Sequence, residues 1–237
     1  MICKPRRRLG RKLFNALLWL LCGWVVLSIL AVTVLRFVPP PISAVMLERW
    51  LAAQVRAEKA FHLHYRWTGW DRLSKQLPLA VIAAEDQKFP FHHGFDVASI
   101  RDALADADAG ERLRGASTIS QQVAKNLFLW NGRSFVRKGL EAWYTVLLET
   151  LWPKRRIVEV YCNIAEFGDG IYGAGAAGER FFHEPADRID AHQAALMAAV
   201  LPNPQRLHID RPSAYVLRRA HWIERQTEQL GGVSYVP

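Results

Sequence analysis

Residues 85–96 read EDQKFPFHHGFD, and the rest of the chain is organised around this stretch. It follows a short apolar segment, Pro78–Ala84, which we expect to be helical with its proline in the first turn, where a helix tolerates it. Glu85 and Asp86 therefore emerge where an apolar element ends. Burial and the negative end of a helix both disfavour ionisation, so we expect the Glu85 pKa to be raised toward the working range of a general base.

A simpler interpretation of the same stretch involves no chemistry. Asp86 and Asp96 would cap turns, and His92 and His93 would be ordinary surface residues. A lone pair of adjacent acids usually has such a structural role. A catalytic role for this stretch therefore needs support from the rest of the chain.

The net charge is concentrated at the N-terminus. The chain carries 31 Lys and Arg against 22 Asp and Glu, a formal net charge of +9. Seven basic residues precede the first acid, Glu48, and they are Lys4, Arg6, Arg7, Arg8, Arg11, Lys12 and Arg36. The remainder has 24 basic against 22 acidic residues and is nearly neutral. Because nucleic-acid binding needs a basic surface, we expect no nucleic acid among the partners.

Residues 13–35 read LFNALLWLLCGWVVLSILAVTVL and contain no charged side chain. A helix needs about 20 apolar residues to cross a bilayer. The main alternative, a cleaved signal peptide, usually has an apolar core of about 7–15 residues, so the longer run favours an uncleaved, single-pass signal anchor. Basic residues before the span, against Arg36 alone after it, predict a cytoplasmic N-terminus. Everything after the span then lies on the other side, which in a bacterium is the periplasmic face of the plasma membrane.

Cysteine usage excludes two ways of stabilising the domain. Cys3 and Cys22 lie in the tail and the span, which leaves Cys162 as the only cysteine beyond them. The domain can form no internal disulfide and no cysteine-based metal site, so it has to be held by its apolar core.

The segment after the span begins with Val38–Pro41, a stiff VPPP spacer, and we expect a helix over Met46–Ala60. Aromatic residues are dense from Phe61 to Trp70. They either lie at the headgroup level of the membrane or face a core from a strand. The period-two alternation of FHLHYRW favours the strand.

From Asp96 onward the patterning is helical. We expect helices over residues 96–109, 117–130, 133–152, 154–166, 173–182, 191–200 and 212–230. Thr118 and Gln121 have the spacing of a capping box. The expected apolar face of the second helix consists of Ile119, Val123, Leu127 and Trp130. That of the third helix consists of Val136, Leu140, Trp143, Leu147 and Leu151.

Polar side chains lie opposite both apolar faces. On the second helix they are Thr118, Gln122 and Lys125, and on the third they are Arg137, Lys138, Glu141 and Thr145. Taken alone, each set is more simply a solvated surface, and Arg137 with Glu141 is then a helical i,i+4 ion pair worth a few tenths of a kcal/mol.

Taken together in order, these pieces resemble the peptidoglycan glycosyltransferases that polymerise lipid II (glycosyltransferase family 51), and in particular their monofunctional, membrane-anchored members. The family's first motif is matched by Glu85, Asp86, Phe89, His92, Gly94 and Asp96. The second is matched by Gly115, Ser117, Thr118, Ile119, Gln121, Gln122, Lys125 and Asn126. The third is matched by Arg137, Lys138 and Glu141. The fourth spans 154–174, with Glu159, Tyr161, Asn163, Gly168 and Gly173, and the fifth closes on Leu201, Pro202 and Pro204. Cys162 departs from the family's usual leucine but is similar in bulk.

The resemblance implies a mainly α-helical, lysozyme-like domain with a small strand element and a cleft open toward the membrane. It divides the chain into a basic tail (1–12), a transmembrane anchor (13–35), a juxtamembrane linker and helix (36–60) and a glycosyltransferase domain (61–237). It implies lipid II and the growing lipid-linked glycan as substrates, with other cell-wall synthesis proteins as candidate partners. Phosphoglycolipids of the moenomycin class are the inhibitors it implies.

The resemblance also implies roles for the motif residues. Glu85 is the general base on the acceptor's 4-hydroxyl, and Glu141 is the second carboxylate, which orients the donor or the cations. Lys125, Arg137 and Lys138 stabilise the departing pyrophosphate. The other expected substrate-binding residues are Asp86, Phe89, His92, Gly115, Ser117, Thr118, Gln121, Gln122 and Asn126. No cofactor is obligatory; Mg²⁺ or another divalent cation is compatible with a pyrophosphate beside carboxylates but not required.

Two other functions use the same residues. A membrane-bound, lysozyme-like hydrolase would employ both carboxylates to cleave glycan with water. The cations Lys125, Arg137 and Lys138 disfavour it, because a neutral leaving sugar does not need them. A non-catalytic cell-wall scaffold is disfavoured by the intact set of carboxylates and cations.

Overall fold

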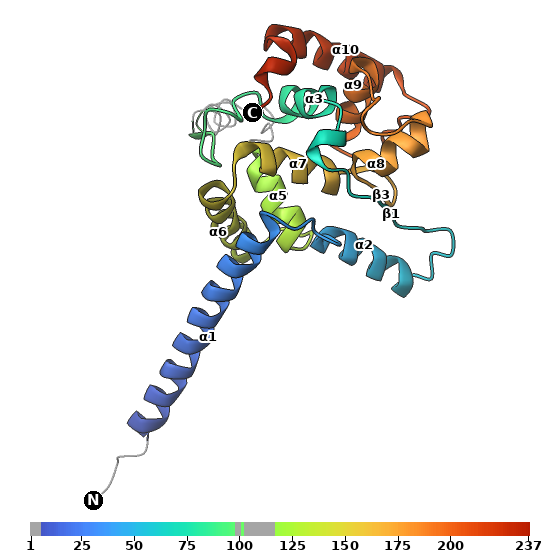
Figure 1. Cartoon of the computed structure of the whole chain (residues 1–237). Helices are drawn as coiled ribbons and strands as arrows, with labels where there is room; N and C mark the ends of the chain where they lie inside the picture. Colours follow the sequence, from blue (N-terminus) through green and yellow to red (C-terminus); the bar gives the residue numbers. More distant parts are fainter. Residues whose placement is uncertain (1–5, 98–100, 102–116) are drawn as a thin grey trace, which may run out of the picture. The chain divides into compact units, whose positions relative to one another are not determined.

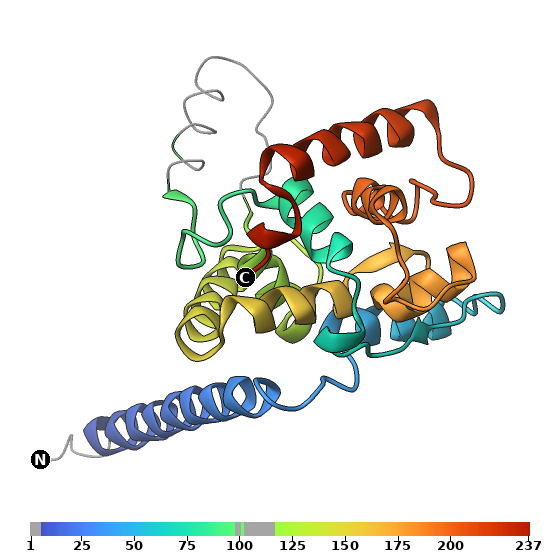
Figure 2. The ribbon, with the colours of Figure 1, turned by 45° about the horizontal axis from the view of Figure 1, so that its top comes forward.

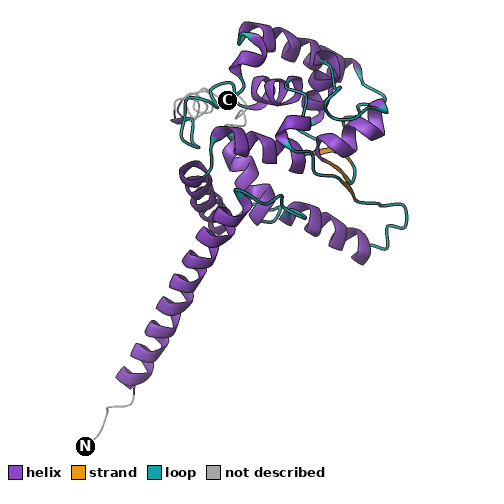
Figure 3. Ribbon diagram, viewed as in Figure 1, coloured by secondary structure: helices purple, strands orange, loops and turns teal. Residues whose placement is uncertain are grey.

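The computed structural model describes residues 6–97, 101 and 117–237 (Figure 1). It divides into two compact units, residues 1–38 and residues 39–237. Helices dominate, and the strands form one small sheet (Figure 3). The prediction of a mainly α-helical chain with a small strand element is confirmed.

The first unit is built on one long helix, α1 (Arg6–Leu35). Within the described residues, Gly10–Leu35 is the one helix long and apolar enough to cross a membrane. At about 1.5 Å of rise per residue, such a helix exceeds the thickness of a bilayer's hydrocarbon core, about 30 Å. The helix is therefore consistent with the single-pass anchor that the sequence predicts.

The second unit contains a three-stranded sheet with the order β1–β3–β2. β1 (His64–Tyr65) runs parallel to β3 (Ile171–Tyr172), and β2 (Glu166–Gly168) pairs antiparallel to β3. The sheet thus joins the segment before the first motif to residues 166–172, which belong to the fourth motif.

The strand expected over residues 61–70 is much shorter than predicted, because side chains take the place of a neighbouring strand. The backbone N–H of Thr68 donates to Asn163 Oδ1 at 2.7 Å, and the N–H of Trp70 donates to Glu159 Oε1 at 2.8 Å. Both acceptors lie on α7 (Lys154–Ile164). Two residues of the fourth motif therefore fix the chain that leads into the next helix, over residues 76–85.

The centre of the second unit is formed by α3 (Gln76–Glu85), which packs against α7, α9 (Ala191–Val200) and α10 (Ala214–Gln229) (Figures 1 and 2). Every residue of α3 from 77 to 83 is buried, as is every residue of α9 from 194 to 200. Helices that are apolar all round need neighbours on several sides. This packing holds the C-terminal end of α3, where Glu85 lies, in a fixed position.

Helix α5 (Ile119–Phe128) crosses between α6 (Phe135–Leu151) and α7, and contacts both. It begins at Thr118 with the predicted capping box. Ile119, Val123 and Leu127 form its buried face as expected. Trp130 does not, because the helix ends before it and its side chain is 47% exposed.

The predicted apolar face of α6 is only partly correct: Leu147 is buried as expected, but the start of the predicted face is not. Val136 is 73% exposed, whereas Glu141 and Thr145, assigned to the polar side, are buried. The buried polar atoms have partners, since the Thr145 hydroxyl donates to the Glu141 carbonyl at 2.7 Å and cations hold the Glu141 carboxylate. Gly94 (φ +88°) lets the first motif pack closely here, because a Cβ at that position would lie 2.7 Å from Thr145 Cγ2.

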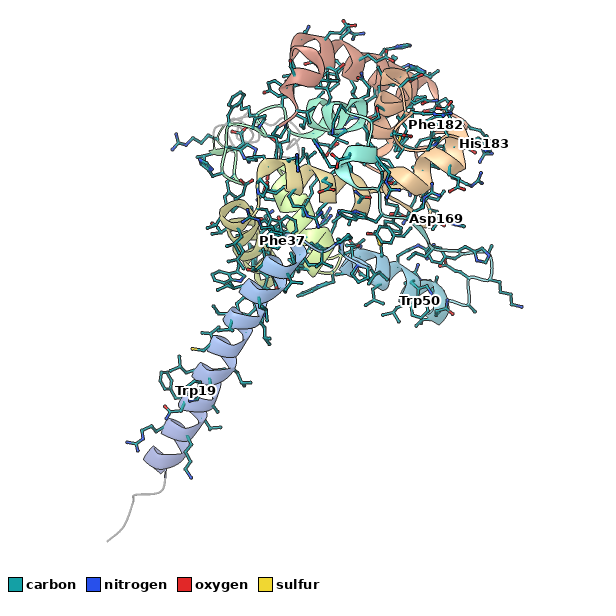
Figure 4. The ribbon with its side chains drawn as sticks, in the orientation of Figure 1. Trp19, Phe37, Trp50, Asp169, Phe182 and His183 are labelled. Atoms are coloured by element: carbon teal, nitrogen blue, oxygen red, sulfur yellow. The ribbon has the colours of Figure 1, made fainter. Side chains whose placement is uncertain are left out.

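The remaining elements complete the second unit. They are α2 (Ala44–Val55), η1 (Trp70–Arg72), α8 (Gly173–Ala177), the π-helical turn η2 (Gly178–Phe182) and η3 (Gly232–Tyr235). Figure 4 shows Trp50 on α2, Asp169 between β2 and β3, and Phe182 with His183 at the end of η2. The helix predicted over 96–109 and the connector 111–115 lie almost wholly outside the described residues.

Candidate active site

Glu85 is the last residue of α3, and its side chain is 16% exposed. Its Oε2 accepts a hydrogen bond from Gln122 Nε2 at 2.9 Å, and Arg219 Nη2 lies 3.6 Å from its Oε1. Burial raises the pKa of the Glu85 carboxyl above its usual range, more strongly than Gln122 and Arg219 lower that pKa. The geometry provides what a general base needs, a partly accessible carboxylate with a raised proton affinity.

Gln122 is itself held in one orientation. The hydroxyl of Tyr161 donates to Gln122 Oε1 at 3.0 Å, which turns the Gln122 amide nitrogen toward Glu85. Tyr161 is buried on α7, and burial raises its pKa well above the usual value, so the hydroxyl stays protonated and donates. The two hydrogen bonds from Tyr161 to Gln122 and from Gln122 to Glu85 thus connect α7, α5 and α3.

Asp86 connects α3 to the start of α5. Its carboxylate accepts the backbone N–H of Ile119 at 3.0 Å and hydrogen-bonds His92 Nε2 at 2.9 Å. The N–H of Gly94 donates to His92 Nδ1 at 3.1 Å, which assigns the ring proton to Nε2. The Asp86 carboxylate is thus occupied at a helix N-terminus, where a negative charge is favoured.

A second cluster lies at the N-terminal end of α6. Arg137 Nη1 donates to Glu141 Oε2 at 2.7 Å, and Lys138 Nζ hydrogen-bonds the other oxygen, Oε1. Arg137 Nε also donates to the Gly132 carbonyl at 2.7 Å. Only 4% of the Glu141 side chain is exposed. Glu141 therefore holds two cations in place, and each of its oxygens accepts a hydrogen bond from one of them.

Lys125 lies one helical turn after Gln122 on α5. The charges of Glu141, Arg137 and Lys138 all act on its ammonium group, and burial, the largest effect, lowers its pKa. No other described residue forms a hydrogen bond with its ammonium, or an ion pair within 4 Å. A partly buried cation without a fixed partner is suited to bind an anion that enters the site.

The remaining predicted site residues are not gathered around Glu85. Thr118 and Gln121 are buried and use their side chains in the capping box of α5, and the Thr118 hydroxyl donates to the Gly94 carbonyl at 2.7 Å. Phe89 is fully buried, under the Lys154 ammonium. Ser117 is exposed and Asn126 is partly buried, while Gly115 lies outside the described residues.

The sequence prediction missed two groups near these residues. Arg219, on α10, lies beside Glu85. The two residues are 134 positions apart in the sequence, so no local sequence pattern could have predicted this contact. Glu149, by contrast, continues a row of polar residues at four-residue spacing from Glu141 through Thr145, which could have indicated a polar buried face. Its carboxylate binds Lys154 Nζ at 2.8 Å and the Ser120 hydroxyl, joining α6 to α7 and α5.

Comparison with known proteins identifies the family of the chain. A family model described as Transglycosylase matches residues 53–228. The chain is 52% identical to the biosynthetic peptidoglycan transglycosylase of Xanthomonas campestris pv. campestris (strain B100) over 236 residues, which cover 98% of this chain and 94% of that protein. It is 53% identical to the protein of the same name from Xylella fastidiosa (strain 9a5c) over 223 residues, covering 94% and 92% of the two chains.

Proposed function

Because this chain belongs to the transglycosylase family and is a peptidoglycan transglycosylase, we propose that it polymerises lipid II into glycan strands at the outer face of the plasma membrane. The observation that carries the proposal is the line of groups along α5. Gln122 holds the buried carboxylate of Glu85, and one turn further Lys125 lies beside the Arg137–Glu141–Lys138 cluster. Helix α5 therefore orients the base, which lies at the end of α3, and carries a cation beside the two cations of α6.

In this proposal the acceptor's sugar 4-hydroxyl attacks the anomeric carbon of the lipid-linked glycan. A new glycosidic C–O bond forms, and the bond between the anomeric carbon and undecaprenyl pyrophosphate breaks. Glu85 takes the hydroxyl proton as the new bond forms, because a neutral sugar hydroxyl is a poor nucleophile. Its raised pKa matches this role, since a base with higher proton affinity transfers the proton more readily near neutral pH.

The leaving pyrophosphate needs charge stabilisation rather than a proton. Lys125, with no fixed partner among the described residues, would bind it directly, and Arg137 would support it with the guanidinium that Glu141 orients. Lys138, half exposed, would add a cation at the rim. Fixed donors and charges of this kind are worth about 2.7–4 kcal/mol each in a site that excludes water.

The other motif residues serve as the framework of this site. Asp86, with His92, fixes the start of α5 against the end of α3, and Thr118 with Gln121 caps α5. Together they set the distance between Glu85 and the residues of α5. Any Mg²⁺ would be held mainly by the pyrophosphate, since no cluster of three His, Cys, Asp or Glu among the described residues could ligate it.

The proposal places the N-terminus in the cytoplasm and residues after α1 in the periplasm. Support comes from the basic residues before the apolar segment and from the length of α1. The partners are lipid II, the lipid-linked glycan, the membrane and other cell-wall synthesis proteins.

The deciding experiment adds purified lipid II to the full chain solubilised in detergent. We expect a glycan polymer and release of undecaprenyl pyrophosphate, with Glu85→Gln as the inactive control. Free reducing sugar ends without pyrophosphate release would instead indicate a hydrolase. No turnover by a folded parent protein would leave a non-catalytic scaffold as the better explanation.

A further inference from the structure

Arg219 approaches the candidate base without hydrogen-bonding to it. Its Nη2 lies 3.6 Å from Glu85 Oε1, within ion-pair range but beyond a hydrogen bond. Its Nε is buried and has no hydrogen-bond partner among the described residues. The guanidinium is therefore held beside the carboxylate by the packing of its helix and not by a bond to it.

Helix α10 is fixed firmly enough to place this charge. Its buried side, formed by Val216, Ala220 and Ile223, faces the core. Gln87 Nε2 donates to Gln226 Oε1 at 2.9 Å, and Gln226 lies seven residues, or two turns, beyond Arg219 on the same side of the helix. The Tyr235 hydroxyl, in η3, donates to the Gln87 carbonyl at 2.6 Å. Gln87, two residues after Glu85, is thus hydrogen-bonded to both α10 and η3.

We propose that Arg219 is a positioning residue for the base: it keeps Glu85 ionised in a buried site while leaving Oε1 open to accept the proton of the acceptor hydroxyl. The proposal rests on the proposed role of Glu85 as general base. Burial alone would protonate a carboxyl group and so disable it, whereas a nearby cation favours the charged form. A hydrogen bond at Oε1 would have a different drawback, because it would occupy one lone pair of the oxygen that takes the proton and would lower its proton affinity.

The two carboxylate oxygens then have different tasks. Gln122, oriented by Tyr161, occupies Oε2 and fixes the plane of the carboxylate. Oε1 has only the more distant charge of Arg219 beside it. We therefore assign proton transfer to Oε1.

Other charged and titratable groups around Glu85 do not provide this effect. Asp86, next in the chain, is an acid and raises the pKa of Glu85. Tyr161, from α7, is a neutral donor, and the Tyr235 hydroxyl, from η3, donates to the Gln87 carbonyl. The side of α9 packed against α3 is apolar. Among the described residues, Arg219 is the cation whose charge acts on Glu85.

The test compares Arg219→Gln with Arg218→Gln, since Arg218 is the exposed neighbour on the same helix. The full chain in detergent is labelled with [δ-¹³C]glutamate, and the Glu85 signal is identified by its absence from Glu85→Gln. We expect the titration midpoint of Glu85 to move to higher pH in Arg219→Gln and to stay at the parent value in Arg218→Gln. The pH at which lipid II polymerisation falls off on the acid side should rise by the same amount. At pH values on this acid side, Arg219→Gln should lose roughly tenfold or more of the polymerisation rate, and at higher pH much less.

Arg219→Lys keeps a cation and should recover most of the shift. If Arg219→Gln does not fold, Arg219→Met, which keeps the aliphatic stem, replaces it. An unchanged Glu85 midpoint in the uncharged variant would overturn the proposal, even if activity were lost. Normal polymerisation by Glu85→Gln would instead remove the general-base assignment, while the titration would still report what Arg219 does to Glu85.

Discussion

Gln122 and Glu85, 37 residues apart in the chain, are joined by a 2.9 Å hydrogen bond from the amide Nε2 to the carboxylate Oε2. The bond ties the end of α3 to the first turn of α5. Because Lys125 lies one turn beyond Gln122, the same helix that orients the base also presents a cation. The relative position of base and cation is therefore set by the geometry of a single helix.

Removing the proton acceptor should abolish turnover while leaving the fold intact. Glu85→Gln keeps the shape of the side chain, and its amide oxygen can still accept from Gln122. Polymerisation of lipid II should fall by about 10²–10⁴, the usual contribution of general-base catalysis. Gln54→Glu, an exposed change outside the site, should polymerise normally. A near-normal rate for Glu85→Gln would reject the assignment.

The raised pKa of Glu85 predicts how activity and stability depend on pH. Activity should fall as pH decreases through that pKa, because the protonated carboxyl cannot take a proton. Stability should change in the other direction. The folded state binds the Glu85 proton more tightly than the unfolded state, so Glu85 lowers the free energy of unfolding as pH rises from the ordinary Glu range through its folded pKa.

Glu85→Gln should therefore melt at a higher temperature than the parent at neutral pH. This advantage should shrink below the ordinary pKa of glutamate, where both states of the parent are protonated. Thermal melts of the two proteins across pH provide the measurement, and a variant less stable than the parent at neutral pH would contradict the prediction.

Loss of either phosphate-binding cation should slow the reaction. Lys125→Ala and Arg137→Ala should each cost on the order of 10²-fold or more in turnover, because the developing charge of the leaving group is left unstabilised. Lys125→Arg keeps the charge but changes its geometry, so it should recover part of the loss. Arg133→Ala, an exposed change four residues before Arg137, should have little effect.

Both alanine variants should also bind phosphoglycolipid inhibitors of the moenomycin class more weakly, as the resemblance implies for mimics of the donor. Equilibrium binding of such an inhibitor separates phosphate binding from chemistry. Parent-like affinity in both variants would reject the phosphate-binding role even if their activity were lost.

Thr118 should matter for stability more than for substrate binding. Thr118→Ala removes the N-cap of α5 and the hydrogen bond to the Gly94 carbonyl. It should cost about 1 kcal/mol, or about 2–4 °C in melting temperature, with the KM for lipid II close to that of the parent. The neighbouring exposed change Ser117→Ala should leave the melting temperature unchanged. A raised KM with parent-like stability in Thr118→Ala would show that Thr118 contacts substrate.

The topology can be tested with reporters fused after Pro237. The basic residues that precede the apolar segment predict that a reporter active only after export should work there. A reporter active only in the cytoplasm should not. The reverse result would reject both the orientation and polymerisation outside the membrane. Removing residues 1–36 should leave a folded domain, since residues 39–237 form a compact unit of their own.

The sequence by itself determined the features whose causes are local. The uncharged run from 13 to 35 predicts the long apolar helix, because spanning depends only on length and composition. The capping box of Thr118 and Gln121 involves four consecutive residues and forms as predicted. The end of α3 at Glu85, and with it the burial that raises the pKa of this residue, follows from an apolar segment that stops at an acid.

The tertiary structure alone decided which of these side chains meet. Thr118 and Gln122 share a helix end, yet the first caps that helix and the second reaches Glu85, because only Gln122 faces the end of α3. The buried side of α6 carries Glu141 and Thr145, since cations and backbone groups satisfy their polar atoms, which hydrophobic periodicity cannot anticipate. Arg219 reaches Glu85 only through the packing of α10 on α3, and contacts across such long stretches of chain leave no local signal in the spacing of residues.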